Sequence, residues 1–281
     1  SQPTFYEFER NGKVIKALAQ TTKTGLTFLL NRETGEPIFP IEEKEVPQGA
    51  IEGDYVSKTQ PFPTKPAPLN PIYFDPEKAF GFTFWDRGHC KRTAKKLRNE
   101  GLFTPPSLQG SIHYPSAVGG NNWGGPAVDP ERNIMVVNTN NMASLIVMIP
   151  REDCNKPLEE LSVNKNQVRY TNIETNEGAP YCNLRSMGFF SPLGVPCTEP
   201  PWGTLTAIDL NNGEHLWNVP LGTSKDLAPF PFWWIKGAPN MGGPTVTASG
   251  VTFIGATSDH YLRAFNTETG EEIVKLSLIH I

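Results

Sequence analysis

A short phrase that occurs three times constrains this chain more than any other feature of its sequence. The most complete copy spans residues 202–217 and reads WGTLTAIDLNNGEHLW, and related copies occupy residues 28–39 and 263–274. In each copy two apolar residues precede Asp or Asn, and Thr or Asn precedes Gly-Glu. Because Asn and Gly tolerate positive φ, each copy predicts a strand, a tight turn and a second strand. Three copies in one chain indicate a repeat architecture.

Further short strands are expected along the rest of the chain. The 25 glycines and 27 prolines favour many strands joined by turns over long helices. We expect the segment 134–149 to form a hairpin like those of the repeats, and 83–98 and 75–81 to be helical. The other expected strands are residues 5–10 and 14–22 around a turn at 11–12, then 26–31, 110–114, 126–128, 242–245, 251–255 and 261–266.

Two long segments fall outside the repeats. Residues 40–76 are rich in proline and are expected to form an extended surface loop, neither regular helix nor central strand. Residues 151–201 form a polar excursion that carries three of the four cysteines. No CxxC pair is present, which disfavours a zinc site. Cys154 and Cys182, or Cys182 and Cys197, are expected to pair in an oxidising compartment, and isolated thiols are the alternative.

Charge and hydropathy narrow the classes of protein. The net charge of −4 and the lack of a basic stripe argue against a nucleic-acid partner. No apolar run reaches the roughly 18 residues that a membrane-spanning helix needs. Sheets of about four strands repeated around an axis form a β-propeller. A β-sandwich is the alternative, but it would not explain the repeated phrase.

The phrase AIDLNNGEHLW resembles the tryptophan-docking motif of the eight-bladed quinoprotein dehydrogenases. In that motif an Ala opens the phrase, a Gly makes the turn and a Trp stacks between blades. The complete copy has Ala207, Gly213 and Trp217 at these positions. The other copies are degenerate: the third keeps Ala264 and Gly270 but has Val274 for the Trp, and the first keeps Gly35 but has Leu29 and Phe39.

Longer stretches resemble one branch of that family, the membrane-bound pyrroloquinoline quinone (PQQ) dehydrogenases of the glucose, quinate and shikimate group. These stretches include TKTGLTFLLNRETGEPI, VPQGAIEGDYVSKTQPF, EGLFTPPSLQGS, NWGGPAVDPERN and GGPTVTASGVTFIGATSDHYLRAFN. The resemblance implies an all-β fold, a partial eight-bladed β-propeller with long Pro-rich loop excursions. We expect residues 1–276 to belong to one PQQ-binding domain truncated at both ends. Residues 277–281 are expected to be a non-native tail, because 276–281 reads like a translated sequencing adaptor.

The resemblance also implies an activity. The parent enzyme would oxidise a hydroxyl of a sugar or cyclic polyol, with glucose to gluconolactone as the first choice and quinate or shikimate as the alternative. PQQ would accept the hydride, Ca²⁺ or Mg²⁺ would polarise the quinone, and ubiquinone would receive the electrons at the periplasmic face of the bacterial inner membrane. A rival from another class is a non-catalytic propeller scaffold that binds proteins; it would keep the docking phrase without needing Lys23.

Two residues are implied to touch the reacting end of the cofactor. Lys23, in the turn TTKTG, would contact the quinone oxygens, where a cation stabilises growing negative charge. Asn138, at the end of IMVVN, would face PQQ with an amide that both donates and accepts. Apart from the resemblance, a lysine in a turn is usually surface, and an asparagine there usually caps a strand.

Asn122 and Trp123, in GGNNWGG, are expected to form a wall of the cofactor pocket, since glycines let backbone approach a flat ligand. Trp202 is expected either at that wall or packed between blades. The general-base Asp and the metal ligands are expected before Ser1, so this fragment alone would be inactive and would hold no metal. His113 and His260 are expected to be polar groups with satisfied hydrogen bonds.

Overall fold

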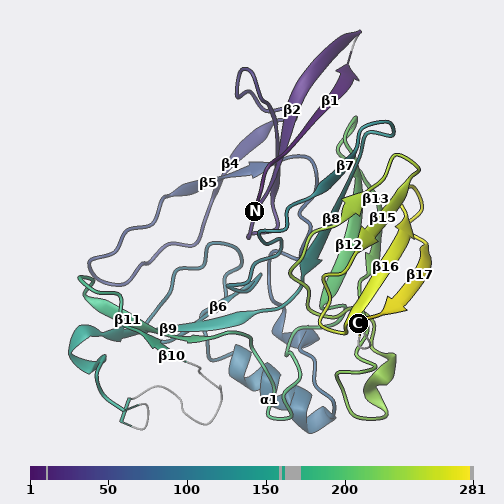
Figure 1. Cartoon of the computed structure of the whole chain (residues 1–281). Helices are drawn as coiled ribbons and strands as arrows, with labels where there is room; N and C mark the ends of the chain where they lie inside the picture. Colours follow the sequence, from purple (N-terminus) through teal and green to yellow (C-terminus); the bar gives the residue numbers. More distant parts are fainter. Residues whose placement is uncertain (11, 158–159, 162–171, 279–281) are drawn as a thin grey trace.

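The structure, a computed structural model, describes residues 1–10, 12–157, 160–161 and 172–278. Its sheets are all antiparallel, and three of them stack side by side as blades (Figure 1). Blade 1 contains β1 (Thr4–Arg10), β2 (Lys13–Thr21) and β3 (Thr27–Asn31). Blade 2 contains β7 (Ala127–Asp129), β8 (Ile134–Asn140), β12 (Gly203–Asp209) and β13 (His215–Pro220). Blade 3 contains β14 (Thr245–Val246), β15 (Val251–Ile254), β16 (Tyr261–Asn266) and β17 (Glu272–Ser277). The predicted all-β class is confirmed.

The strands of each blade follow one another in chain order from one edge of the sheet to the other. The first strands of the three blades, β1, β7 and β14, are neighbours, as expected for the strands nearest the axis of a propeller. In blade 1 the chain returns beside β3, where Ile38 donates its amide to the carbonyl of Leu29 at 2.8 Å. Each blade is therefore a meander that presents its two faces to its neighbours.

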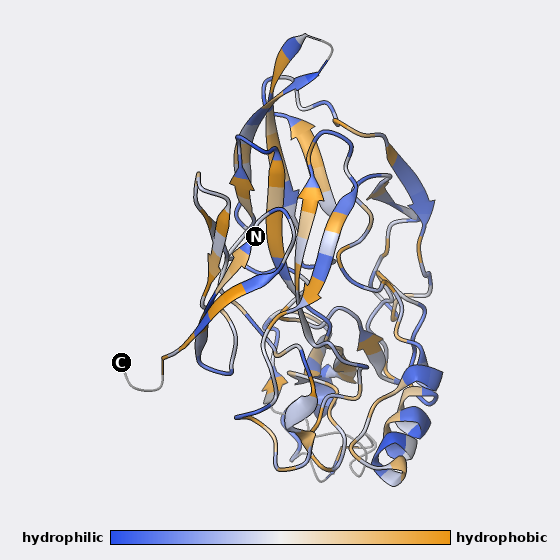
Figure 2. Cartoon of the chain, turned by 90° about the vertical axis from the view of Figure 1, so that its right-hand side faces the viewer, coloured by the Kyte–Doolittle hydropathy of each residue, from blue (hydrophilic) through white to orange (hydrophobic). Residues whose placement is uncertain are grey.

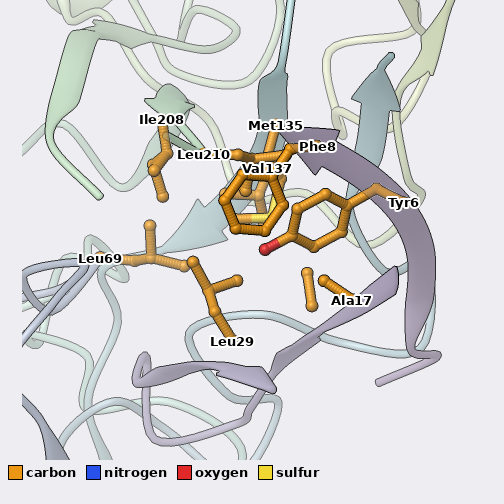
Figure 3. Close-up of a cluster of buried hydrophobic side chains, with 10 residues drawn as sticks. Tyr6, Phe8, Ala17, Leu29, Leu69, Met135, Val137, Ile208 and Leu210 are labelled. Carbon is orange, nitrogen blue, oxygen red and sulfur yellow. The ribbon is translucent and has the colours of Figure 1, made fainter. Parts of the chain in front are cut away.

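Blade 2 is buried on both faces because alternate residues of its inner strands point to different blades. Met135 and Val137 pack with Tyr6 and Phe8 of blade 1 (Figure 3), and Val136 packs toward blade 3. Successive side chains of a strand point to opposite faces, and here both faces are covered by a neighbouring blade. All of β8 and most of β12 are therefore buried. Figure 2 shows the hydrophobic residues concentrated in these stacked strands, whereas most of the helix α1 (Phe84–Ala94) is hydrophilic.

The repeated phrase folds in the same way in all three copies. The turn glycines donate to the carbonyls of Asn31, Asp209 and Asn266 at 2.8, 2.8 and 2.9 Å, and their φ angles are 78°, 74° and 72°. In each copy the side chain of that Asn or Asp also accepts the backbone N–H of the second residue after it. The pattern recurs in sequence because this turn needs a side-chain acceptor at its start and positive φ at its end.

Aromatic residues join each blade to the turn of the next. The indole N–H of Trp217 donates to the carbonyl of Thr267 at 3.0 Å, and its ring lies against Gly270. Phe39 lies in the same way against Gly213, where an added β-carbon would be 3.0 Å from the Phe39 ring. The copy whose Trp is replaced by Phe39 therefore still supplies an inter-blade aromatic contact. Val274, at the corresponding position of blade 3, is 41% exposed.

The remaining elements lie to one side of the blades and below them (Figure 1). A fourth sheet has the order β10 (Asn172–Glu174), β11 (Tyr181–Ser186), β9 (Ser144–Pro150) and β6 (Ser111–His113). β4 (Ile41–Glu45) and β5 (Thr59–Pro63) form a two-stranded ribbon, and three 3₁₀ helices are η1 (Pro76–Lys78), η2 (Arg151–Asp153) and η3 (Phe232–Trp234). The predicted helical segments 83–98 and 75–81 are confirmed as α1 and η1. Thr83 caps α1 by accepting the amide of Asp86 at 3.1 Å.

One sequence prediction is wrong and two are incomplete. Residues 134–149 are not a hairpin, because β12 occupies the edge of β8 along Asn140–Ile134 and the chain leaves that sheet after Asn140. Residues 40–76 contain the β4–β5 ribbon. Both of its strands are edge strands, which tolerate prolines such as Pro61 and Pro63. Residues 151–201 contain β10 and β11, and β11 pairs with β9.

Both disulfides join residues that are distant in sequence. Cys154 pairs with Cys182, as predicted, but the alternative partner for Cys182 is wrong, because Cys197 pairs with Cys90 on α1. The spacing gave no signal for a bond across 107 residues. Among the described residues, no helix combines the length and the hydropathy required to span a bilayer. Asn11, in the predicted turn at 11–12, and the last three residues of the predicted tail 277–281 lie outside the described residues.

Candidate functional site

A glycine-rich loop, residues 119–125, ties the turn after β2 to the end of β8. The amide of Gly120 donates to the carbonyl of Lys23 at 2.8 Å, and the side chain of Asn121 donates to the carbonyl of Asn138 at 3.0 Å. Asn121 also accepts the hydroxyl of Thr21 at 2.6 Å. Two consecutive loop residues therefore fix Lys23 and Asn138 relative to each other.

Six buried asparagines continue this connection across the ends of the strands. Asn140 and Asn240 exchange two hydrogen bonds, of 2.6 and 2.8 Å, and Asn240 also donates to the carbonyl of Thr139 at 3.0 Å. An amide side chain can donate and accept at once, so it satisfies peptide groups where sheet pairing ends. The asparagine network consists of Asn70, Asn121, Asn138, Asn140, Asn141 and Asn240.

Asn138 retains one unused acceptor within this network. Its side-chain nitrogen donates to Asn240 and to the carbonyl of Gly242, the latter at 2.7 Å. Its Oδ1 is buried and has no hydrogen-bond partner. An unsatisfied buried acceptor is uncommon, because leaving it unpaired costs about 1–3 kcal/mol. Asn138 is therefore able to accept a hydrogen bond from a ligand.

Lys23 lies at the mouth of a pocket of 230 Å³. The pocket is lined by Lys23 and Thr24 together with residues 101–104 and 112–117. Lys23 is exposed, and its ammonium donates to the carbonyl of Ala117 at 3.1 Å. A β-carbon on Gly119 would stand 2.7 Å from Cγ of Lys23. This glycine is thus required for packing against the lysine itself, and the lysine ammonium keeps donors for a ligand.

His113 also lines this pocket, and the hydrogen bonding of its imidazole differs from the prediction. Its Nε2 is buried without a hydrogen-bond partner, so the predicted satisfied polar group is wrong. Burial lowers the pKa of the imidazole, because the charged form loses its hydration. The ring is therefore held neutral beside Lys23.

The other predicted site residues divide between the loop and a separate cluster. Asn122 caps the loop by donating to Val118 and accepting from Trp123, at 2.7 and 2.8 Å, and Trp123 is 66% exposed. Trp202 is 6% exposed; its indole N–H donates to Thr198 at 2.8 Å and its ring meets Phe80 edge-on. Trp202 therefore packs against Phe80 of the 75–81 segment, outside the three blades.

Close backbone contact between Gly124 and Gly243 accounts for the paired glycines at 124–125 and 242–243. A β-carbon on Gly243 would stand 2.3 Å from the carbonyl oxygen of Gly124. Backbone of the 119–125 loop therefore packs directly on backbone that leads into blade 3.

Among the described residues, no group of three or more His, Cys, Asp or Glu side chains is arranged to hold a metal ion.

Sequence reasoning found Asn138 but missed the other five asparagines of the network. The available signal was the density of asparagine at the predicted ends of strands, in NN at 121–122 and NTNN at 138–141. Asn70 and Asn240 stand alone beside prolines, and nothing local distinguishes them from ordinary turn residues.

Comparison with known proteins agrees with this architecture. The chain is 38% identical to quinoprotein glucose dehydrogenase of Escherichia coli (strain K12), over 97% of this chain and 34% of that protein. It is 34% identical to quinate/shikimate dehydrogenase (quinone) of Acinetobacter baylyi, over 99% of this chain and 35% of that protein. The chain thus spans about a third of the length of these curated relatives.

Among solved structures, europium-containing methanol dehydrogenase matches 99% of this chain and 35% of its own with a TM-score of 0.51 at 18% identity. At that identity the likeness concerns the fold, and it supports the prediction of a partial propeller. The family model described as glucose/ethanol/alcohol dehydrogenase, beta-propeller domain, matches residues 1–280. Taken with the three docked blades, these matches identify the chain as a member of the PQQ-dependent quinoprotein dehydrogenase propeller family.

Proposed function

We propose that this chain forms part of the PQQ pocket of a quinoprotein dehydrogenase that oxidises a hydroxyl group of a sugar or cyclic polyol. The observation that carries the proposal is the connection of Lys23 to Asn138 through Gly120 and Asn121. A non-catalytic scaffold would need the docking turns but would have no use for a buried, unpaired amide oxygen on Asn138, which the loop links to the exposed Lys23.

The residues present fit the implied cofactor. Asn138 Oδ1 is a buried acceptor without a partner, and Lys23 offers a cation at the edge of a pocket. When bound, PQQ supplies the quinone that accepts the hydride from the substrate carbon. Lys23 would bind and orient the quinone oxygens and favour negative charge there, and Asn138 would position the ring system. Asn122, Trp123 and Trp202 complete the proposed cofactor-binding set, with Trp202 acting through packing.

The finer assignments belong to the same proposal. Glucose is the first-choice substrate, with conversion to gluconolactone, and quinate or shikimate is the alternative. Ubiquinone is the proposed acceptor of the electrons, and Ca²⁺ or Mg²⁺ the proposed cation, with its ligands and the general base supplied by the full-length protein. The proposed location is the periplasmic face of the bacterial inner membrane, where the two disulfides would be stable. This chain alone is then expected to be inactive.

The test uses the full-length protein that contains this chain, reconstituted with PQQ and Mg²⁺ or Ca²⁺. Lys23→Ala should weaken PQQ binding about 10- to 100-fold, the value of a charged hydrogen bond, as measured by equilibrium dialysis with detection of PQQ absorbance. Lys13→Ala is the matched control, since Lys13 is an exposed lysine at the other end of β2. Unchanged PQQ binding and unchanged dehydrogenase activity in Lys23→Ala would contradict the proposal.

A further inference from the structure

A second pocket, of 250 Å³, shares Tyr114 with the Lys23 pocket. Its other walls come from Pro71, residues 73–75, Lys78, Asn141 and residues 198–201. Asn141 belongs to the asparagine network, because it accepts from Asn70 and donates to the carbonyl of Pro201 at 2.8 Å. The pocket is therefore built onto the framework that fixes Asn138. Its volume lies below the range of about 300–1,000 Å³ typical of drug-sized ligands and suits a single small ring.

Aromatic side chains form the apolar part of this pocket. Tyr73, Phe74 and Tyr114 line it, and Phe74 meets Tyr114 edge-to-face with ring centroids 6.2 Å apart. Tyr73 is 48% exposed and is available at the entrance. An aromatic face is electron-rich, so it attracts the C–H face of a ring whose hydroxyls point outward.

Thr198 supplies a polar group that lacks a partner. Its side chain is 1% exposed, it lines the pocket, and its Oγ1 makes no hydrogen bond. A hydroxyl both donates and accepts, so the hydroxyl of a ligand is a suitable partner. The wall is held in place on both sides of Thr198, because Cys197 is bonded to Cys90 and the carbonyl of Thr198 accepts the indole N–H of Trp202. A site held in this way loses little entropy on binding.

The charged residues that line the pocket favour some polyhydroxy ligands over others. Asp75 and Glu199 contribute two carboxylates to the lining, against one ammonium from Lys78. Burial, and after it the negative charge of Glu199, raises the pKa of the Tyr114 phenol, which therefore remains a neutral donor. An anionic ligand would meet this negative balance, whereas the hydroxyls of a neutral ligand can donate to both carboxylates.

We propose that this pocket binds a neutral monosaccharide in its ring form, in preference to a cyclic polyhydroxy acid. The proposal rests on the proposed function, since it makes the pocket the place where a sugar substrate is held beside the Lys23 pocket. Tyr73 and Tyr114 provide the stacking surface, and Thr198, Glu199 and Asp75 pair with ring hydroxyls. The pocket would then determine specificity for sugars over quinate within the same family.

The experiment measures ligand binding to the full-length protein that contains this chain, without PQQ, with D-glucose and quinate as the two probes. Calorimetric titration should give tighter binding of glucose than of quinate. Tyr73→Ala and Thr198→Val should each weaken glucose binding by about 2- to 10-fold. Tyr55→Ala, which removes a tyrosine that is 83% exposed elsewhere, should leave it unchanged. Glu199→Gln should raise the affinity for quinate relative to glucose.

Circular dichroism of each variant separates a lost contact from a lost fold, and saturation-transfer NMR on the unmodified full-length protein detects glucose contact independently of any variant. Equal or tighter binding of quinate, or glucose binding that Tyr73→Ala and Thr198→Val leave unchanged in folded protein, would overturn the proposal. The proposed function fails separately: loss of PQQ binding by the full-length protein would contradict it while leaving a sugar pocket intact. Binding of PQQ without binding of glucose would remove the sugar pocket alone.

Discussion

The ring of Trp217 lies against the backbone of Gly270, so that a β-carbon at position 270 would stand 2.6 Å from the indole. The same indole donates to Thr267, three residues earlier in the same turn. One side chain of blade 2 therefore recognises both the shape and a hydrogen-bonding group of the turn in blade 3. Phe39 and Gly213 repeat the shape part of this relationship between blades 1 and 2.

Removing the ring of Trp217 should loosen blade 3. Trp217→Ala is expected to lower the free energy of unfolding by about 3 kcal/mol, since it deletes a packed aromatic ring and leaves Thr267 without its donor. Urea unfolding followed by circular dichroism measures this loss. Leu216→Ala, at the exposed neighbouring position, should cost much less. Similar losses in the two variants would show that the contact does not hold the blades together.

The asparagine network should be sensitive at its centre. Asn240→Ala removes the acceptor of the Asn138 amide and the donor to the carbonyl of Thr139, so it should destabilise the chain by about 2–3 kcal/mol. The control is Asn218→Ala, because Asn218 is an exposed asparagine with one side-chain bond, to Thr206. Thermal unfolding of both variants provides the comparison. A smaller effect for Asn240 than for Asn218 would contradict a cooperative network.

The two disulfides should differ in their contribution to stability. The Cys90–Cys197 bond spans 107 residues and the Cys154–Cys182 bond spans 28, and the longer loop loses more entropy when closed. Replacing Cys90 and Cys197 together by Ser is expected to cost about 4–5 kcal/mol, and replacing Cys154 and Cys182 about 1 kcal/mol less. Urea unfolding of the two double variants tests the order. The reverse order would mean that the unfolded chain is already restricted around residues 90–197.

His113 should make stability depend on pH. Burial places its folded-state pKa below the ordinary value of 6.5, so the unfolded state takes up a proton first as the pH falls. The stability from the neutral, buried ring is complete above that value and is lost as the pH falls below it. His113→Gln should therefore show a shallower loss between about pH 7 and about pH 5 in urea unfolding. Parallel curves for the two proteins would exclude this role.

The repeated turns could be predicted because their information is local. Asn31, Asp209 and Asn266 each bond to residues within five positions of themselves, so the phrase alone specifies the turn. The helix after Thr83 was also predicted, and the structure shows that its cap is local, because Thr83 accepts the amide of Asp86. The pairing of β8 with β12 was not predictable, because residues 141–202 separate the two strands, and because both faces of β8 pack against blades, so that its sequence shows no polar alternation. Phe39 also escaped recognition, since its partner Gly213 is contributed by a distant turn.

The site was predictable only where a motif surrounded the residue. Lys23 follows β2 and Asn138 lies within β8, both in recognisable segments, whereas Asn70 and Asn240 reach the same network from proline-containing loops. Thr198 and Tyr73 line a pocket whose walls are assembled from four parts of the chain. Such convergence depends on tertiary packing, which no local pattern encodes.

The long connection between β8 and β12 within blade 2 has a consequence for synthesis on the ribosome. β8 pairs with β12 along its whole length, yet residues 141–202 separate the two strands. During translation β8 therefore emerges well before the strand that covers its outer edge, with Val136 and Val137 exposing apolar groups on both faces. Contacts between positions so far apart slow folding, because the intervening chain must first be ordered. We therefore expect the nascent chain to rely on chaperones until β12 has left the ribosome, and blade 3 to dock last.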